Sequence, residues 1–444
     1  MNYLLLRIAF RNVLANFRHS LAALLSISAA FMAIVIFDGY VTHIRDLYLN
    51  SYRYRGMFGD VILENEQIRS KNGRSDPWLY SLSSDQQKEI DQFVSRHQEQ
   101  VVASVKNLNL FGSITNGKVS AIYFTRAYDV AEGLKMRSYL SDEWKWNVLY
   151  GKPFHESEAP DKILIGQTLG ATLGCEPVAR ERIITKNGGY KSGLRPFTCK
   201  TEDVQLSLTT ESGQLNAMDF KPIGLVDAGY RDIDARYLML PLDQAQKLAN
   251  TSKVSYYTMM LKNTDDSGDF ISAFNKELGA QFKDLKMSRW QDHEIGDLFK
   301  KTMELLMIFK NFVIIVIVFI SCLSIFSTFV KNVKERTKEI GLLLSLGFYR
   351  AQVLKIFLLE AAVLSLIGLL GGGALGLVGG AVLNNSAIYY KAGLLSEPVV
   401  FQVATNPASI LLSALGLIAV AVFSCYLSVS TTIRQKIVDC LQHS

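Results

Sequence analysis

Long apolar runs occupy four places along the chain, one near the N-terminus and three in the last third. They cover residues 21–37, 312–330, 361–383 and 410–430, and none contains a charged residue. A helix rises about 1.5 Å per residue, so runs of roughly 17 to 23 residues can cross most or all of a hydrocarbon core about 30 Å thick. A buried helix of a soluble protein rarely reaches such a length without a polar face. The pattern therefore predicts four transmembrane helices.

The first apolar run has a competing interpretation as a cleaved signal peptide. The apolar core of such a peptide usually covers about 7 to 15 residues and ends at a small-residue cleavage site. Here the run continues through Phe31, Ile34 and Phe37. The length of the run favours an uncleaved membrane helix.

The residues before this run have the periodicity of an amphipathic helix. Apolar side chains at positions 6, 9, 10, 13 and 17 share one helical face, and arginines at 7, 11 and 18 share another. We therefore expect an interfacial helix over residues 1–19 on the inner leaflet. A plain helical extension of the first span is the alternative.

The region between the first and second apolar runs has the composition of a soluble domain. Short β-branched or alternating runs predict strands at 60–63, 101–105, 162–165, 204–209 and 256–261, and helical patterns cover 242–248 and 266–278. Asn116-Gly117 predicts a type I′ hairpin, and Gly and Asn clusters at 71–76 and 186–193 predict loops. The expected fold class is an α+β membrane protein, with four transmembrane helices and a large mixed α/β domain between helices 1 and 2.

Lysine and arginine near the helix ends give an orientation, because basic residues are retained on the cytoplasmic side. They are Arg7, Arg11, Arg18, Lys331, Lys334, Arg336, Lys338, Arg350, Lys355, Arg434 and Lys436. Both termini and the loop after helix 2 are therefore predicted to be cytoplasmic, and the large domain extracytoplasmic. Arg45, Arg53 and Arg55 after helix 1 oppose this orientation, but long translocated domains are weakly governed by charge.

The five cysteines divide according to this topology. Cys322 and Cys425 lie in predicted membrane helices and Cys440 lies in the cytoplasmic tail, so we expect all three to be reduced. Cys175 and Cys199 lie in the domain on the oxidising side of the membrane. We expect them to form a disulfide that closes a loop of about 24 residues, with two free thiols as the alternative.

A glycine pattern in the third apolar run has two interpretations. Residues 371–376 satisfy GxGxxG, which binds a nucleotide only between a strand and an exposed helix start, whereas this run is expected in mid-membrane. Gly368, Gly372, Gly376 and Gly380 recur every four residues and place a bare stripe on one side of the helix. Such a stripe allows another backbone to approach closely. We expect helix packing and no nucleotide binding.

Residues 331–350 combine a dense charged stretch, Lys334 to Glu339, with an apolar stretch closed by Gly347. A glycine in this position is the usual form of a helix stop. On these residues alone, the segment is either a docking surface for a partner or a solvated loop.

Catalytic and metal-binding patterns are missing from the sequence. The six histidines form neither HExxH nor a Cys/His cluster with metal-ligand spacing. There is no phosphate loop and no nucleophile signature. We therefore expect no enzyme activity and no cofactor or metal in this chain.

The charged segment resembles the permeases of the MacB, LolC/LolE and FtsX superfamily of ABC transporters, whose hallmark is an E-R-x-x-E-I-G run and a later glycine after the second helix. The matching residues are Glu335, Arg336, Glu339, Ile340, Gly341 and Gly347, with Lys338 inside the run. Looser likenesses occur at 59–62, 165–166, 173–174, 237–248 and 360–380. Two departures are residues 435–440, which replace the family's usual Asp-Pro, and the insertion between Cys175 and Cys199.

The resemblance implies a mechanotransmission (type VII) permease of the bacterial inner membrane, closest in layout to the stand-alone LolC/LolE-like permeases and with a MacB-like periplasmic core domain. It implies a second permease copy or a paralogue, membrane lipid around the helices, and docking on a dimer of a separate ATPase subunit that binds ATP and Mg. A periplasmic or outer-membrane partner is compatible with it, and nucleic acid is not expected. The candidates for docking are Glu335, Arg336, Lys338 and Glu339, with Gly341 and Gly347 allowing the bend.

The implied function is release or export of lipoprotein, lipid, or peptide and drug cargo, driven by ATP hydrolysis in the partner. The alternative is an FtsX-like regulator that activates a periplasmic cell-wall hydrolase without moving cargo. An extracytoplasmic domain of about 260 residues favours the transport function.

The expected boundaries follow from these assignments. They are a cytoplasmic amphipathic helix at 1–19, transmembrane helix 1 at 20–37, the periplasmic domain at 38–300, a stalk and transmembrane helix 2 at 301–330, a cytoplasmic coupling segment at 331–355, transmembrane helix 3 at 356–387, a short periplasmic loop at 388–408, transmembrane helix 4 at 409–430 and a cytoplasmic tail at 431–444.

Overall fold

The structure is a computed structural model that describes Arg11 and residues 17–76, 78–139, 148–178, 195–228, 231–390 and 399–433. Most of the predicted N-terminal helix, the loop predicted at 186–193 and the tail from residue 434 onward lie outside the described residues. The chain divides into two compact units. Unit 1 comprises Met1–Asp46, Thr302–Ile388 and Phe401–Ser444, and unit 2 comprises Leu47–Lys301 and Tyr389–Val400.

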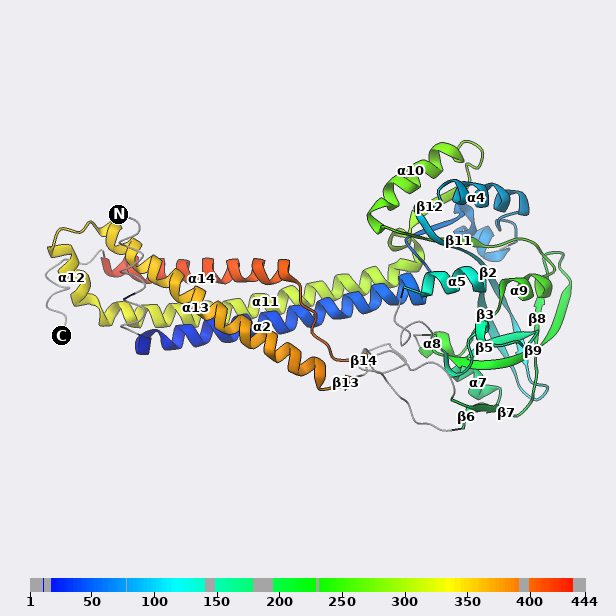
Figure 1. The fold of residues 1–444 in the computed structure, drawn as a ribbon, viewed down its shortest axis with the longest axis horizontal. Helices are drawn as coiled ribbons and strands as arrows, with labels where there is room; N and C mark the ends of the chain where they lie inside the picture. The colour runs from blue at the N-terminus through cyan, green and yellow to red at the C-terminus, as the bar shows by residue number, and fades with distance from the viewer. Residues whose placement is uncertain are drawn as a thin grey trace. The chain divides into compact units, whose positions relative to one another are not determined.

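Unit 1 is a bundle of helices (Figure 1). The helices are α2 (Phe17–Asn50), α11 (Glu294–Glu335), α12 (Thr337–Ser345), α13 (Arg350–Asn385) and α14 (Pro407–Ile433). The segments long and apolar enough to span a membrane are Leu21–Arg55, Glu294–Glu335, Arg350–Asn385 and Pro407–Ser430. The prediction of a multi-pass membrane protein, with one candidate span near the N-terminus and three toward the C-terminus, is confirmed.

All four long helices contribute to one buried apolar cluster in unit 1. Its members include Ile27 and Phe31 of α2, Ile325 of α11, Phe357 of α13 and Leu417 of α14. Because lipid is as apolar as these side chains, their association relies on close packing and on polar contacts between helices.

The glycine stripe of α13 lies against α2 of the same chain. A Cβ atom on Gly372 would lie 2.4 Å from the carbonyl oxygen of Ser28, and one on Gly368 would lie 2.9 Å from Ile27. Ser28 Oγ also donates a hydrogen bond to the carbonyl oxygen of Gly368 at 2.9 Å. Gly376 similarly faces Val35. The stripe therefore supports a contact between two helices of one chain.

Unit 2 is a mixed α/β domain. Its strands are β1 (Val61–Asn65), β2 (Val101–Thr115), β3 (Ser120–Tyr128), β4 (Val148–Gly151), β5 (Lys162–Gly166), β6 (Cys175–Pro177), β7 (Phe197–Cys199), β8 (Val204–Thr209), β9 (Leu215–Val226), β10 (Tyr237–Met239), β11 (Tyr256–Leu261), β12 (Leu285–Arg289), β13 (Tyr389–Tyr390) and β14 (Val399–Val400). Its helices are α3 (Lys71–Ser75), α4 (Ser84–Arg96), α5 (Val130–Arg137), α7 (Gln167–Thr172), α8 (Arg231–Asp234), α9 (Leu242–Ala249) and α10 (Ser267–Glu277).

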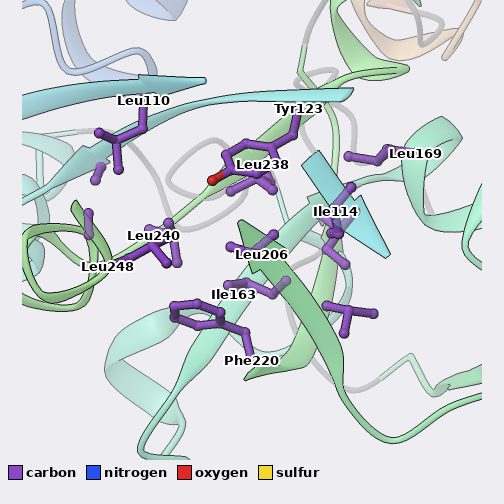
Figure 2. Packing of buried hydrophobic residues seen from close by; sticks show 14 of the residues in the cluster. Leu110, Ile114, Tyr123, Ile163, Leu169, Leu206, Phe220, Leu238, Leu240 and Leu248 are labelled. Carbon is purple, nitrogen blue, oxygen red and sulfur yellow. The ribbon is translucent and has the colours of Figure 1, made fainter. Parts of the chain in front are cut away.

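Ten of these strands form one sheet in the order β12-β1-β11-β2-β3-β10-β5-β9-β4, with β8 paired to both β2 and β9. Leu206, Ile114, Tyr123 and Phe220 from its strands pack with residues of α7 and α9 in one buried cluster (Figure 2). A second cluster joins β1, β11 and β12 to α4 and α10. Burial of these alternating apolar faces fixes the register of the strands.

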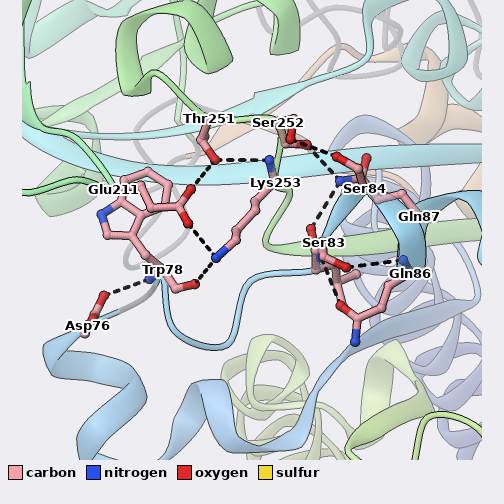
Figure 3. Close-up of polar contacts among 11 residues, drawn as sticks. Asp76, Trp78, Ser83, Ser84, Gln86, Gln87, Glu211, Thr251, Ser252 and Lys253 are labelled. Atoms are coloured by element: carbon pink, nitrogen blue, oxygen red, sulfur yellow. Dashed lines mark hydrogen bonds and ion pairs between the residues drawn. The ribbon is translucent and has the colours of Figure 1, made fainter.

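A short loop connects the two clusters through polar contacts. Lys253 Nζ donates to Glu211 Oε1 at 2.6 Å and to the carbonyl oxygen of Trp78 at 3.2 Å (Figure 3). Ser252 contributes its hydroxyl to a hydrogen bond with Ser84 at 2.8 Å. Residues 251–253 thereby connect the turn after β8 to the start of α4.

Two local predictions in unit 2 are wrong. The hairpin between β2 and β3 forms, but only Gly117 of the Asn116-Gly117 pair has a positive φ, of 81°, so the turn is not type I′. Asn116 Oδ1 accepts hydrogen bonds from the backbone N–H groups of Lys118 and Val119, which stabilises a longer loop. The loop predicted at 71–76 contains helix α3, because the Ser70 side chain caps its first turn by accepting from Gly73 N.

Candidate functional site

The segment between α11 and α13 contains a one-residue interruption of the helical backbone. Helix α11 ends at Glu335 and α12 begins at Thr337, with Arg336 between them at φ −100° and ψ 14°. The buried Thr337 hydroxyl donates to the carbonyl oxygens of Val333 at 3.1 Å and Lys334 at 2.8 Å. These bonds satisfy two of the carbonyls that a helix leaves without a backbone partner at its end.

Arg336 lies between two carboxylates from different elements. Its Nη1 is 2.6 Å from Glu360 Oε2 on α13, and its Nε is 2.7 Å from Glu339 Oε2 on α12. Its guanidinium also lies 4.7 Å from the ring centre of Phe357. Burial disfavours the charged form, but the hydrogen bonds to Glu339 and Glu360 outweigh it and raise the pKa of Arg336. The guanidinium is therefore a fixed positive charge.

The opposite side of the segment is exposed. Its exposed residues recur at helical spacing and include Lys331, Lys334, Glu335, Lys338, Glu339, Leu342, Leu346 and Tyr349, which we call the docking face. Leu346 and Tyr349 are 68% and 76% exposed, whereas Ile340 on the opposite side is fully buried. A face with charges at one end and exposed apolar side chains at the other is typical of a protein interface.

The residues predicted for docking occupy two different environments. Glu335, Lys338 and Glu339 are exposed, whereas Arg336 is largely buried in the contact with Glu360. Arg336 is thus placed to hold the segment together instead of lying on its surface.

The two glycines predicted to allow a bend also differ. Gly347 has φ 91°, a left-handed conformation that favours glycine, and follows the end of α12. Gly341 lies buried inside α12. The interruption of the helix therefore lies at Arg336 and not at Gly341.

A second buried ion pair joins α2 to α11. Lys310 Nζ is 2.9 Å from Asp38 Oδ1, and their side chains are 17% and 9% exposed. Phe37 and Phe309, the preceding residue of each helix, make an edge-on ring contact. Ionisable groups within an apolar bundle are costly unless they are paired.

Within unit 2, the end of the first long helix meets the start of α11. Tyr52, in the π-helical turn Ser51–Arg55, stacks on Trp290 with ring centres 5.3 Å apart, and Phe299 contacts both rings. His293 Nδ1 accepts from Ile295 N at 3.0 Å and so caps the first turn of α11. Its Nε2 lies 2.9 Å from Glu64 of β1. Buried contacts within unit 2 thereby hold the π-helical turn and the first turns of α11.

Cys175 and Cys199 lie opposite each other in the antiparallel pair β6–β7 and are joined by a disulfide. Residues 179–194 of the insertion that this bond closes lie outside the described residues. Cys322 and Cys425 are free cysteines on α11 and α14.

Sequence reasoning did not assign roles to Glu360, Asp38 or Lys310. Each is a charge at the edge of a long apolar run, which is a usable signal, but the identity of its partner depends on helix packing. Across the described part of the chain, no group of three or more His, Cys, Asp or Glu residues could hold a metal ion.

The last third of the chain matches a known family of membrane domains. Residues 311–437 match the model described as "FtsX-like permease C-terminal". That range contains the interruption at Arg336, the docking face and the Glu360 contact.

Two curated proteins are similar over 177 residues, which is 40% of this chain. The uncharacterized ABC transporter permease MJ1507 of Methanocaldococcus jannaschii is 25% identical, and the lipoprotein-releasing system transmembrane protein LolC of Xylella fastidiosa is 24% identical. The match covers 44% and 41% of those two proteins, so the chain spans less than half the length of the curated relatives it matches.

Two solved structures also align with this chain. The extracellular domain of the noncanonic ABC-type transporter YknZ from Gram-positive bacteria aligns at 10% identity and a TM-score of 0.32, covering 52% of this chain and 98% of that domain. The periplasmic region of MacB from Actinobacillus actinomycetemcomitans aligns at 12% identity and the same TM-score, covering 55% of this chain and 92% of that region. At a TM-score of 0.32, neither alignment by itself establishes a shared fold.

Proposed function

We propose, from the FtsX-like permease domain at residues 311–437, that this chain is the membrane-spanning permease subunit of an ABC transporter of the FtsX, MacB and LolC type. A separate ATPase subunit binds ATP and Mg and docks on the segment between α11 and α13. The permease converts closure of that ATPase into movement of unit 2. We further propose the bacterial inner membrane as its location, with both termini in the cytoplasm and unit 2 on the other side.

The docking face within residues 331–349 supports this proposal. Exposed apolar side chains such as Leu346 lose water contact when a partner covers them, which favours association. Lys338 and Glu335 add charges that align a partner and exclude wrong ones. The opposite side of the same segment packs into the bundle through Ile340 and Arg336, so a load on the docking face reaches the membrane helices directly.

The cargo that fits this proposal is a lipoprotein, a lipid, or a peptide or drug. The similarity to LolC, a lipoprotein-releasing system protein by name, supports the first of these. The size of unit 2, Leu47–Lys301, favours a domain that handles cargo over a regulator that only transmits a signal.

Co-purification from the native membrane tests the proposed function. The full chain should carry an ATPase subunit with a phosphate loop, together with lipid or lipidated protein, identified by mass spectrometry. ATP hydrolysis should require that subunit. ATP hydrolysis by the permease alone, persisting after contaminants are removed, would contradict the assignment of ATP hydrolysis to a separate subunit.

A further inference from the structure

The two carboxylates that hold Arg336 differ in exposure and in the element that carries them. Glu339 lies one turn further along the same segment and its side chain is 44% exposed, whereas Glu360 lies on α13 and its side chain is 9% exposed. A buried carboxylate depends on its partner for stabilisation far more than a solvated one does. The contact with Glu360 is therefore the dominant constraint on the guanidinium.

Helix α13 fixes the orientation of Arg336 as well as its position. Glu360 accepts from Nη1 at 2.6 Å and from Nη2 at 3.4 Å. Phe357 lies one turn earlier on the same face of α13, and its ring faces the guanidinium. A planar fork held by a carboxylate and an aromatic ring has few alternative arrangements.

Helix α12 is consequently tied to α13 near both ends. Its N-cap residue is Arg336, held by Glu360, and its last residue is followed by a connection of only Leu346 to Tyr349 before α13 begins at Arg350. Without the first tie, α12 could turn about the interruption while the short connection at its other end stayed intact.

We propose that Glu360 is a positioning residue that holds the interruption between α11 and α12 and so fixes the direction of α12 relative to α13. This inference rests on the proposed function in one respect, namely that the load on α12 comes from a docked ATPase. The positioning itself belongs to the permease and exists without the partner.

Matched glutamine variants test the proposal on the full chain. Spin labels on Cys residues introduced at Leu342 of α12 and Leu366 of α13, which are each 54% exposed, report the distance between the helices. Cys322, Cys425 and Cys440 are first replaced by serine. Glu360→Gln and Glu339→Gln each replace one carboxylate that contacts the Arg336 guanidinium with a neutral amide. The two variants therefore differ only in which contact is weakened.

We expect Glu360→Gln to broaden the distance distribution about twofold, because α12 samples further orientations. Glu339→Gln should keep the distribution narrow. An unchanged width in Glu360→Gln, or equal broadening in both variants, would overturn the proposal.

The reciprocal variant Arg336→Glu with Glu360→Arg separates positioning from a general packing role. It restores the charge pair in reverse, so the distribution should become narrow again, whereas a packing role for Glu360 would leave it broad and refute the inference. If Glu360→Gln fails to fold, Arg336→Lys serves instead, because lysine keeps the charge but lacks the planar fork. We expect Arg336→Lys to broaden the distance distribution. A narrow distribution in this variant would refute the proposal. All distances are measured without an ATPase, so their outcome does not depend on the proposed function. ATP turnover of the complex tests the proposed function separately.

Discussion

Asp38 and Lys310 place opposite charges on neighbouring helices of unit 1, 2.9 Å apart and mostly buried. Arg336 with Glu360 does the same at the segment between α11 and α13. In an apolar bundle each such charge needs its partner, because removing one leaves an uncompensated charge out of water. Both pairs join residues that are far apart in sequence, so the sequence shows the charges but not their pairing.

Replacing Asp38 with asparagine should destabilise the bundle. It leaves the Lys310 ammonium without its carboxylate, and breaking a buried pair costs about 3 to 5 kcal/mol; the partial exposure of Lys310 favours the lower value. Thermal unfolding of the full chain in detergent measures the effect, and the reciprocal swap Asp38→Lys with Lys310→Asp should recover most of the loss. An Asp38→Asn variant that melts like the wild type would show that the pair contributes nothing.

Glu211 should give unit 2 a contribution to stability that depends on pH. The hydrogen bond from Lys253, followed by the one from Thr251, lowers the pKa of the Glu211 carboxyl. A carboxyl whose pKa is lowered in the folded state stabilises the fold at pH values above its ordinary pKa of about 4.3. This contribution is lost as the pH falls through the lowered folded-state pKa.

The variant Glu211→Gln should therefore melt at a lower temperature than the wild type at neutral pH. The loss in free energy of unfolding should be less than about 1 kcal/mol, because the pair is partly solvated. The difference should vanish in acid, below the folded-state pKa. A difference that stays constant across the acid range would mean that the glutamine acts through packing and not through charge.

At the scale of elements, the predicted strand at 204–209 and the predicted helix at 242–248 coincide closely with β8 and α9. Their periodic apolar positions face a core, so pattern and structure agree. The prediction failed at α3, where Ser70 caps a turn rich in Gly and Asn, and at the hairpin turn, where the Asn116 side chain replaces backbone bonds. In both places a local side-chain hydrogen bond outweighed residue preferences.

The candidate site was predicted only in part, because the sequence indicates its local properties but not its packing. The sequence of 331–350 indicates charge, a helix stop at Gly347 and a position between two spans, and all of these are local properties. It cannot indicate that Arg336 turns inward to Glu360 while Lys338 stays exposed, because that depends on where α13 packs.

A single methyl group on Gly372 should disturb the contact between α2 and α13. Its Cβ would lie 2.4 Å from the Ser28 carbonyl oxygen, so one of the two backbones must move. Overpacking of this kind typically costs about 1 to 3 kcal/mol. Gly372→Ala should therefore lower the melting temperature of the full chain.

Gly416→Ala on α14 is the matched control, since a Cβ there meets nothing within 4 Å. It should melt like the wild type or slightly higher, because alanine favours a helix. Equal melting of the two variants would show that the α2–α13 contact tolerates separation.

At the scale of the whole molecule, the disulfide between Cys175 and Cys199 provides a test of orientation. If unit 2 lies on the oxidising side of the membrane, a thiol probe added to intact cells should modify neither cysteine until a reductant is added. Loss of the bond in Cys175→Ser with Cys199→Ser should lower stability by about 3 kcal/mol, from closure of a loop of this length. Labelling of both thiols without reductant would contradict the bond, whereas no labelling by a membrane-impermeant probe after reduction would contradict the orientation.

In the proposed function, an ATPase docks on the face within residues 331–349. Reversing Glu335 and Glu339 together to lysine changes the charge of this region and leaves the basic residues that mark the loop as cytoplasmic. Glu339 also contacts Arg336, so Glu339→Gln is the matched control: it weakens that contact without introducing positive charge.

The measurement is pull-down of the ATPase, with ATP turnover, at equal membrane abundance of each variant. Loss of a desolvated interfacial charge typically costs about 2 to 5 kcal/mol, or roughly 30-fold to several thousand-fold in affinity. We therefore expect the double reversal to lose binding and turnover by at least the lower figure, and the Glu339→Gln control to stay within about fivefold of the wild type. Equal recovery and equal turnover in the double reversal would contradict docking on this face and place the contact elsewhere.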